Sequence, residues 1–231
     1  SVELRPGSTV SPQTDRLHHV ALEVENAEAM RIYLQSQGVA VPATTETNAA
    51  GNREFSVRDP NGHRLHFVEY APDGLTRRDA GQHLPSTRIA PRMSHAGLLV
   101  GQLSASLRFY GEVLGCVETW RGGAGPLLSW VNLRVPDGQD YLEFMLYDKP
   151  PTRESLLGKH HICLEVPSVP QAAEVLRERS LPPGVRKPDA MKVGVNGKRQ
   201  VNCYDPDGTR VEIMEPTTVD GRPVPPSAAP P

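Results

Sequence analysis

Two histidines and two glutamates stand at strand-like positions of this sequence and could together bind a metal ion. They follow one another as His95, Glu143, His161 and Glu212, with 48 positions from the first histidine to its glutamate and 51 from the second. A single histidine at a strand start is most simply a hydrogen-bonded surface residue. A glutamate inside an apolar strand needs a reason, because an unpaired buried carboxylate is costly. Two imidazoles and two carboxylates suit one divalent ion and leave positions free for water and substrate, without choosing among Zn, Ni, Co, Mn and Fe.

The alternation of side chains along each strand predicts that these four residues share one face. Leu142 and Phe144 flank Glu143 and are expected to pack on a helix, so the glutamate points the other way. Val211 and Ile213 flank Glu212 in the same manner. If two such sheets curl around a shared cavity, the four polar side chains meet in its middle.

The elements that carry these residues recur three times, each time in the order strand, helix, strand, strand, strand. Residues 18–24 and 160–166 are nearly alike, and they lead to the similar turns Asp59-Pro-Asn-Gly62 and Asp205-Pro-Asp-Gly208. The middle copy has the same order but its own residues. Three copies of one βαβββ unit are therefore predicted.

Helical periodicity predicts a helix in each copy, over residues 27–37, 104–114 and 169–179. For the second of these, Ser104 is the expected N-cap and Gly115 the expected stop. Short strands near Val39 and Val185 complete the first and third copies.

The predicted organisation has five parts. Residues 1–16 are a remnant strand and linker, 17–72 a lone βαβββ module, and 73–92 a linker rich in Pro and Gly. Residues 93–216 form a complete two-module domain, and the Pro-rich tail 217–231 is expected to be extended or disordered.

Composition excludes several classes of function. The 231 residues carry a net charge of −2 without a basic stripe, so a nucleic-acid partner is not expected. No apolar run is long enough to cross a membrane, and Cys116, Cys163 and Cys203 are expected to be small buried thiols. The protein is expected to be soluble, and cytoplasmic rather than exported. Because the chain begins at Ser1, we expect an upstream segment to have been removed or never built, which leaves a cleaved signal peptide open.

Several segments resemble the vicinal oxygen chelate superfamily, which contains glyoxalase I, methylmalonyl-CoA epimerase, extradiol dioxygenases and metal-free antibiotic-binding proteins. They are Ser-His-Ala-Gly-Leu-Leu-Val, Leu-Arg-Phe-Tyr-Gly-Glu-Val-Leu-Gly, Tyr-Leu-Glu-Phe-Met, His-His-Ile-Cys-Leu-Glu-Val and Asp-Pro-Asp-Gly-Thr-Arg-Val-Glu-Ile-Met-Glu, within residues 94–215. The resemblance implies an α+β fold in which two βαβββ modules pair into a curved-sheet barrel around a metal site, with one further N-terminal module.

The resemblance also implies a ligand set and a reaction. In glyoxalase I the ligands run His or Gln, Glu, His, Glu, and the four residues above occupy those places. The dioxygenases use His, His and Glu, so Glu143 favours the isomerase-like branch. The implied reaction is that of a lyase or isomerase which moves a proton between adjacent carbons of a small oxygenated substrate through an enediolate. Glu143 or Glu212 would act as general base and acid.

Two departures from the family pattern bear on the substrate. Leu99 and Tyr147 stand where the glutathione-using enzymes carry Arg and Asn, so glutathione is not supported. No organic cofactor is predicted. The residues expected to line a partly apolar pocket are Trp130, Asn132, Met145, Asn202, Tyr204 and Met214.

A second metal site in the first module stays an open alternative. His19 and His66 stand at the ligand places of the lone module, and Glu3 at that of a missing partner, so a second site needs another chain or a lost segment. A homodimer, with modules paired across chains, is therefore predicted.

The rival functions are an Fe(II) extradiol-type dioxygenase, favoured by the extra module, and a metal-free small-molecule binding or resistance protein.

Overall fold

The computed structural model describes residues 17–149 and 159–230, which fall into two compact units. The N-terminal unit holds His18–Arg88 together with Ser104–Leu114. The C-terminal unit holds Ile89–Leu103 and the chain from Gly115 onward, and it contains all four predicted metal ligands.

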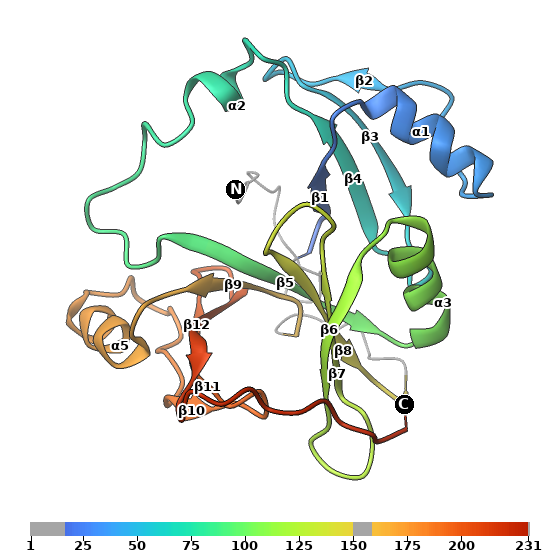
Figure 1. The fold of residues 1–231 in the computed structure, drawn as a ribbon. Coiled ribbons are helices and arrows are strands. Elements are labelled where there is room, and N and C mark those ends of the chain that lie inside the picture. The colour runs from blue at the N-terminus through green and yellow to red at the C-terminus, as the bar shows by residue number, and fades with distance from the viewer. Residues whose placement is uncertain (1–16, 150–158, 231) are drawn as a thin grey trace. The chain divides into compact units, whose positions relative to one another are not determined.

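The N-terminal unit contains one complete βαβββ module (Figure 1). Its four-stranded sheet has the order β1-β4-β3-β2, with β1 parallel to β4 and the other pairs antiparallel. Phe55 and Phe67 stack in its core, with ring centroids 5.1 Å apart. The elements are β1 (Val20–Glu23), α1 (Ala27–Ser36), β2 (Glu46–Thr47), β3 (Arg53–Arg58), β4 (Arg64–Glu69) and the short helix α2 (Leu75–Arg78).

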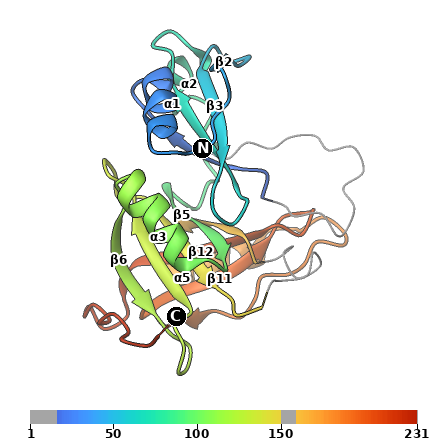
Figure 2. The same ribbon diagram turned by 90° about the vertical axis from the view of Figure 1, so that its right-hand side faces the viewer.

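The C-terminal unit is built on one eight-stranded sheet, ordered β10-β11-β12-β9-β5-β8-β7-β6, which curls into a half-barrel (Figure 2). β5 and β9 are antiparallel neighbours at its centre, and each is parallel to the last strand of its own module, β8 or β12. The two modules therefore repeat one pattern on either side of the β5–β9 pair. The elements are β5 (Arg92–Val100), β6 (Val117–Gly122), β7 (Trp130–Arg134), β8 (Tyr141–Leu146), β9 (His161–Glu165), α5 (Val169–Glu178), β10 (Lys192–Val193), β11 (Lys198–Tyr204) and β12 (Arg210–Thr218).

The first and third modules position their helices with the same device. A glutamate at or near the end of the last strand accepts a hydrogen bond from the first turn of the helix: Glu69 from the amide of Ala27 and Glu215 from that of Val169, each at 2.9 Å. These amides have no partner within the helix, and negative charge is favourable at a helix N-terminus. The glutamates thus fix each helix to its sheet.

The similar turns before those last strands also have one structure. The Oδ1 atom of Asp59 accepts hydrogen bonds from the amides two and four residues later, and Asp205 does the same, all at 2.8–2.9 Å. Gly62 and Gly208 have φ of 85° and 83°, which only glycine adopts without strain. The repeat in the sequence is therefore a repeat of turn chemistry.

Helix α5 covers one face of the eight-stranded sheet. Val169 and Ala172 of the helix pack against Val201 of β11 and Ile213 of β12 in one buried cluster. Since Glu212 neighbours Ile213 along the strand, it points to the opposite face, which we call the site face.

Three local predictions were wrong. The helix predicted over 104–114 begins at Leu103, so Ser104 is not its N-cap. It consists of α3 (Leu103–Leu107) followed by a π-helical turn, η1 (Arg108–Val113). Gly115 ends the helix as predicted. The strands expected near Val39 and Val185 lie further along the chain, as β2 and β10. A strand needs a neighbouring strand, and the residues of β2 and β10 are the ones that pair with β3 and β11.

The tail leaves β12 after Thr218 and runs without helix or strand through residue 230. Three backbone hydrogen bonds join its described residues to the same unit: the Val219 amide donates to the Gly197 carbonyl, the Ser227 amide to the Arg121 carbonyl on β6, and the Leu128 amide to the Pro230 carbonyl. Residues 217 and 218 of the predicted tail are thus the end of β12, and the extended or disordered form of the rest stays a prediction.

Candidate metal centre

The strand registers bring the four predicted ligands into two rows on the site face. In one row, Gly97 of β5 is the partner of both Glu143 on β8 and His161 on β9. In the other row, Cys163 of β9 is the partner of both His95 on β5 and Glu212 on β12. Each row carries one histidine and one glutamate.

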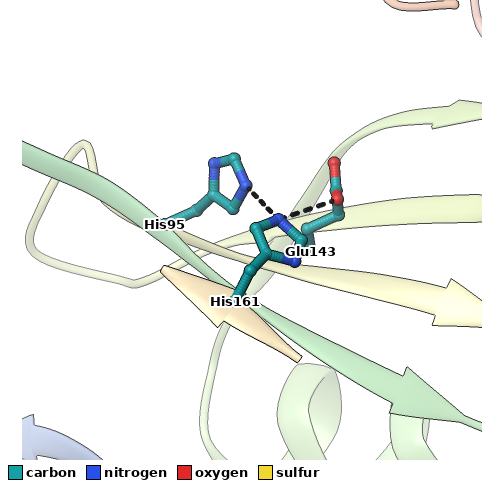
Figure 3. Close-up of side chains that lie close together, drawn as sticks. All are labelled: His95, Glu143 and His161. Carbon is teal, nitrogen blue, oxygen red and sulfur yellow. Dashed lines mark hydrogen bonds and ion pairs between the residues drawn. The ribbon is translucent and has the colours of Figure 1, made fainter. Parts of the chain in front are cut away.

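The side chains of His95, Glu143 and His161 point toward one another (Figure 3). The Nε2 atoms of His95 and His161 lie 3.1 Å apart, and the His161 Nε2 lies 3.6 Å from the Oε2 of Glu143. The Oε2 of Glu212 lies 3.5 Å from the His95 Nε2 and 3.8 Å from the His161 Nε2. Atoms that each bond a metal at roughly 2.0–2.2 Å lie roughly 3–4 Å from one another. The ligand atoms of His95, Glu143 and His161 all lie within 4.8 Å of one another, so their spacing fits one shared ion.

The chemistry of the cluster also fits a cation. The four side chains are only 0–11% exposed. Burying two carboxylates side by side is unfavourable unless positive charge compensates them. A buried His/Glu cluster of this kind can hold a divalent metal, and the donor set leaves its identity open.

The local environment gives the two carboxyl groups opposite pKa shifts. Burial raises the pKa of Glu143, and the charge of Glu212 adds to the increase while His95 opposes it. Burial would raise the pKa of Glu212 as well, but its hydrogen bond with His95 and nearby positive charge, including that of Arg210, outweigh burial and lower it to about 2. Glu212 is thus the carboxylate that stays ionised, and Glu143 is the stronger base.

His161 is held as a neutral imidazole. Burial, together with the charge of Arg210, lowers its pKa to about 3. Its Nδ1 lies 3.1 Å from the carbonyl oxygen of Lys159 and can donate a hydrogen bond to it. That tautomer leaves the Nε2 lone pair free, as a metal ligand requires.

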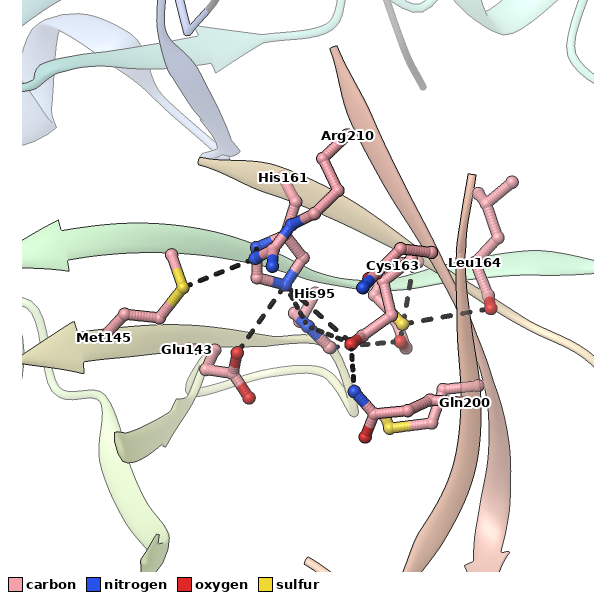
Figure 4. A network of polar contacts seen from close by, with 12 residues as sticks. His95, Glu143, Met145, His161, Cys163, Leu164, Gln200 and Arg210 are labelled. Atoms are coloured by element: carbon pink, nitrogen blue, oxygen red, sulfur yellow. Dashed lines mark hydrogen bonds and ion pairs between the residues drawn. The ribbon is translucent and has the colours of Figure 1, made fainter. Parts of the chain in front are cut away.

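Two further side chains support the cluster (Figure 4). Gln200 on β11 donates a hydrogen bond from Nε2 to the Oε1 of Glu212, at 2.5 Å. Arg210 on β12 donates a hydrogen bond to the Lys159 carbonyl at 2.8 Å, the same oxygen that accepts from the His161 Nδ1 in this tautomer. Both fix the orientation of a ligand rather than adding one.

Gly97 makes the site possible sterically. A Cβ built on it would lie 2.0 Å from Cε1 and 2.3 Å from Nδ1 of the His161 ring, far inside van der Waals contact. The imidazole therefore lies directly against the backbone of β5, a close approach that only glycine permits.

The residues predicted for the substrate pocket lie on the ligand-bearing strands β8 and β12 or on their neighbours β7 and β11. Asn132 is the β7 partner of Glu143, and Asn202 is the β11 partner of Glu212, with each Oδ1 buried and without a hydrogen-bond partner among the described residues. Trp130 pairs with Met145, whose Sδ contacts Arg210, and Met214 pairs with Gln200. Tyr204 donates a hydrogen bond to Asp189 at 2.9 Å. Their role in binding substrate stays a prediction.

The two predicted ligand histidines of the N-terminal module lie side by side. The rings of His19 and His66 stack with centroids 4.0 Å apart. Glu3, the third predicted member, lies outside the described residues. A second metal site there stays a prediction.

Sequence reasoning missed Gly97, Gln200 and Arg210. Arg210 stands two residues before Glu212, so strand alternation places both on the site face. A glycine inside an apolar strand signals a close approach. Nothing local marks Gln200, whose contact with Glu212 depends on the pairing of β11 with β12.

Repeated βαβββ modules with a buried His/Glu cluster between two of them define the class of fold. The sequence pattern of the Glyoxalase/Bleomycin resistance protein/Dioxygenase superfamily matches residues 92–213, more than half of the chain. The chain therefore belongs to this superfamily, which confirms the predicted family and fold class. No curated protein matches it.

Solved structures share the fold at low sequence identity. The Mn(II)-bound glyoxalase from Novosphingobium aromaticivorans is 17% identical with a TM-score of 0.61, over 93% of this chain and 68% of that one. The 2,3-dioxygenase LapB from Pseudomonas sp. KL28 is 17% identical with a TM-score of 0.60, over 90% of this chain and 76% of that one. A catechol 2,3-dioxygenase is 15% identical with a TM-score of 0.61, over 94% and 77%. Glyoxalase and dioxygenase are equally distant, so this likeness does not select a reaction.

Among the described residues, no helix is long and apolar enough to span a membrane.

Proposed function

We propose that the protein is a divalent-metal-dependent lyase or isomerase of the glyoxalase type, which moves a proton between adjacent carbons of a small oxygenated substrate. The observation that carries the proposal is the buried second carboxylate, Glu143, 3.6 Å from His161 and on the opposite side of the cluster from Glu212. A site with two histidines and one carboxylate would bind a metal without it. The second carboxylate supplies a base next to the substrate.

Divalent ions of the first row are the expected cofactor, held by His95, Glu143, His161 and Glu212. When bound, such an ion would polarise adjacent substrate oxygens and so acidify the neighbouring C–H bond. Zn, Ni, Co, Mn and Fe all suit the donor set.

The two glutamates differ in how firmly they are held, which suggests different roles. Glu212 accepts the hydrogen bond from Gln200 and its pKa is low, so we assign it as the fixed, ionised ligand. Among the described residues, no side chain donates a hydrogen bond to Glu143, and burial raises its pKa. We therefore assign Glu143 as the group that takes the proton from one carbon and returns it to the next.

The test combines elemental analysis with a substrate screen in deuterated water. The chain, loaded in turn with each of the five metals, is offered α-keto aldehyde thiol adducts, acyl-CoA epimers and catechols. We expect one stoichiometric metal, turnover of a substrate from the first two classes, and solvent deuterium on the carbon that exchanges its proton. Oxygen uptake with a catechol would instead support the dioxygenase. Absence of a stoichiometric metal would support a binding or resistance protein.

Glutamine variants test the assignments. Glu212→Gln should abolish turnover, and Glu143→Gln should lower it by roughly 10²–10⁴-fold, the contribution of a positioned acid or base. Glu118→Gln is the matched control, because Glu118 pairs with Arg121 on β6 away from the four ligands. Retained activity in Glu212→Gln would overturn the assignment of that residue. Dimer formation through the N-terminal module stays part of the proposal and is measurable by light scattering.

A further inference from the structure

A cysteine lies inside the metal centre beside two of its ligands. Cys163 is a free thiol with 0% exposure, on the site face of β9. Its strand partners are His95 on one side and Glu212 on the other. One ligand atom from each of these three residues lies within 4.8 Å of the other two.

The equivalent place in the other half of the sheet has no side chain. In each of the two rows, the residue in the middle pairs with a histidine of one module on one neighbouring strand and with a glutamate of the other module on the other neighbouring strand. That residue is Gly97 in the row of His161 and Glu143, and Cys163 in the row of His95 and Glu212. The cluster is therefore symmetric in its nitrogen and oxygen donors, and sulfur is added on one side alone.

Two overlapping donor sets result. His95, Glu143 and His161 offer nitrogen and oxygen, while His95, Cys163 and Glu212 offer nitrogen, sulfur and oxygen. Both sets need the His95 imidazole, so one ion excludes the other. Thiolate selects soft, thiophilic metals, whereas imidazole with carboxylate also accepts harder ions such as Mn²⁺.

We propose that His95, Cys163 and Glu212 form a second, mutually exclusive binding position for thiophilic divalent ions, represented by Cd²⁺. On binding, a sulfur–metal bond forms and the thiol proton passes to solvent. An ion there occupies His95 and Glu212 and so displaces an ion held by the nitrogen and oxygen set. The inference concerns metal binding alone and holds whatever reaction the site catalyses.

Cadmium titration of the full chain tests the proposal, with the ultraviolet charge-transfer absorption of a cadmium–thiolate bond as the readout. Wild type, Cys116→Ser and Cys203→Ser should all show the absorption with release of pre-bound Mn²⁺. Cys163→Ser should lose the absorption and bind Cd²⁺ roughly 10- to 100-fold more weakly, while it keeps its affinity for Mn²⁺. The other two cysteines are the matched controls, since neither belongs to the cluster.

A reciprocal variant makes the test independent of how Cys163→Ser folds. Glu143 belongs to the nitrogen and oxygen set alone, so Glu143→Gln should weaken Mn²⁺ binding roughly tenfold or more and keep the cadmium–thiolate absorption. Absence of the absorption in wild type, its persistence in Cys163→Ser, or an equal loss of both metals in Glu143→Gln would overturn the proposal. These outcomes are separate from a failure of the proposed function, which is judged by turnover.

Discussion

Replacing Gly97 by alanine should remove His161 from the metal centre. The new Cβ would lie 2.0 Å from the nearest ring atom, whereas ordinary contacts begin at 3.4 Å. The ring would have to move by roughly 1.4 Å, and a metal ligand tolerates a displacement of roughly 0.2 Å. The φ of Gly97 is not in the left-handed region, so the effect of the substitution is steric.

The expected result is a large loss of metal binding with a modest loss of stability. Loss of a residue that hydrogen-bonds to a metal ligand lowers metal affinity roughly 10- to 100-fold. Loss of the ligand His161 itself should lower the affinity by at least as much. Overpacking a buried site lowers the free energy of unfolding by about 1–3 kcal/mol. Metal titration and elemental analysis measure the first quantity, and chemical denaturation of the metal-free chain measures the second.

Gly101→Ala is the matched control for this prediction. A Cβ there would lie 2.7 Å from the ring of Tyr147, so it crowds an aromatic ring on the same unit without touching the four ligands. It should bind metal as wild type does. If Gly97→Ala also binds metal with wild-type affinity, the close packing of His161 on β5 is not required and the reasoning fails.

Two further predictions concern hydrogen bonds to carboxylates. Gln200→Leu should raise the pKa of Glu212 and weaken metal binding roughly 10- to 100-fold in a metal titration, and unchanged affinity would show that the 2.5 Å hydrogen bond does not orient the ligand. Burial alone would raise the pKa of Asp59, but hydrogen bonds from His63 and Tyr110 hold it below its usual range. The ionised Asp59 therefore stabilises the folded state at pH values above the pKa of this group in the unfolded chain, which is near 4. That stability is lost as pH falls through the lower folded pKa, so Asp59→Asn should reduce the free energy of unfolding by about 1–3 kcal/mol at pH 7. The difference between variant and wild type should shrink toward pH 2 in thermal unfolding, and a difference that stays constant with pH would contradict this reasoning.

The fold was predictable where local patterns decide it. Strand alternation, the turn at Asp59 and its copy at Asp205, and the helical periods depend on residues close in the sequence, and the structure has those elements within a few residues. The strands near Val39 and Val185 were misplaced because a two-residue strand is defined by its neighbour rather than by its own residues. The π-helical turn at Arg108–Val113 has no periodic signal that separates it from an α-helix.

The sequence by itself determined which residues could share a face and what chemistry they could offer. A strand repeats every two residues, so His95, Glu143, His161 and Glu212 were assigned to one face before any pairing was known. Only the tertiary structure decided their distances. The antiparallel pairing of β5 with β9 brings the Nε2 atoms of His95 and His161 to 3.1 Å across 66 positions of sequence. The same pairing sets Gly97 beneath one histidine and Cys163 beside the other, because register between distant strands is fixed by the packing of the whole sheet.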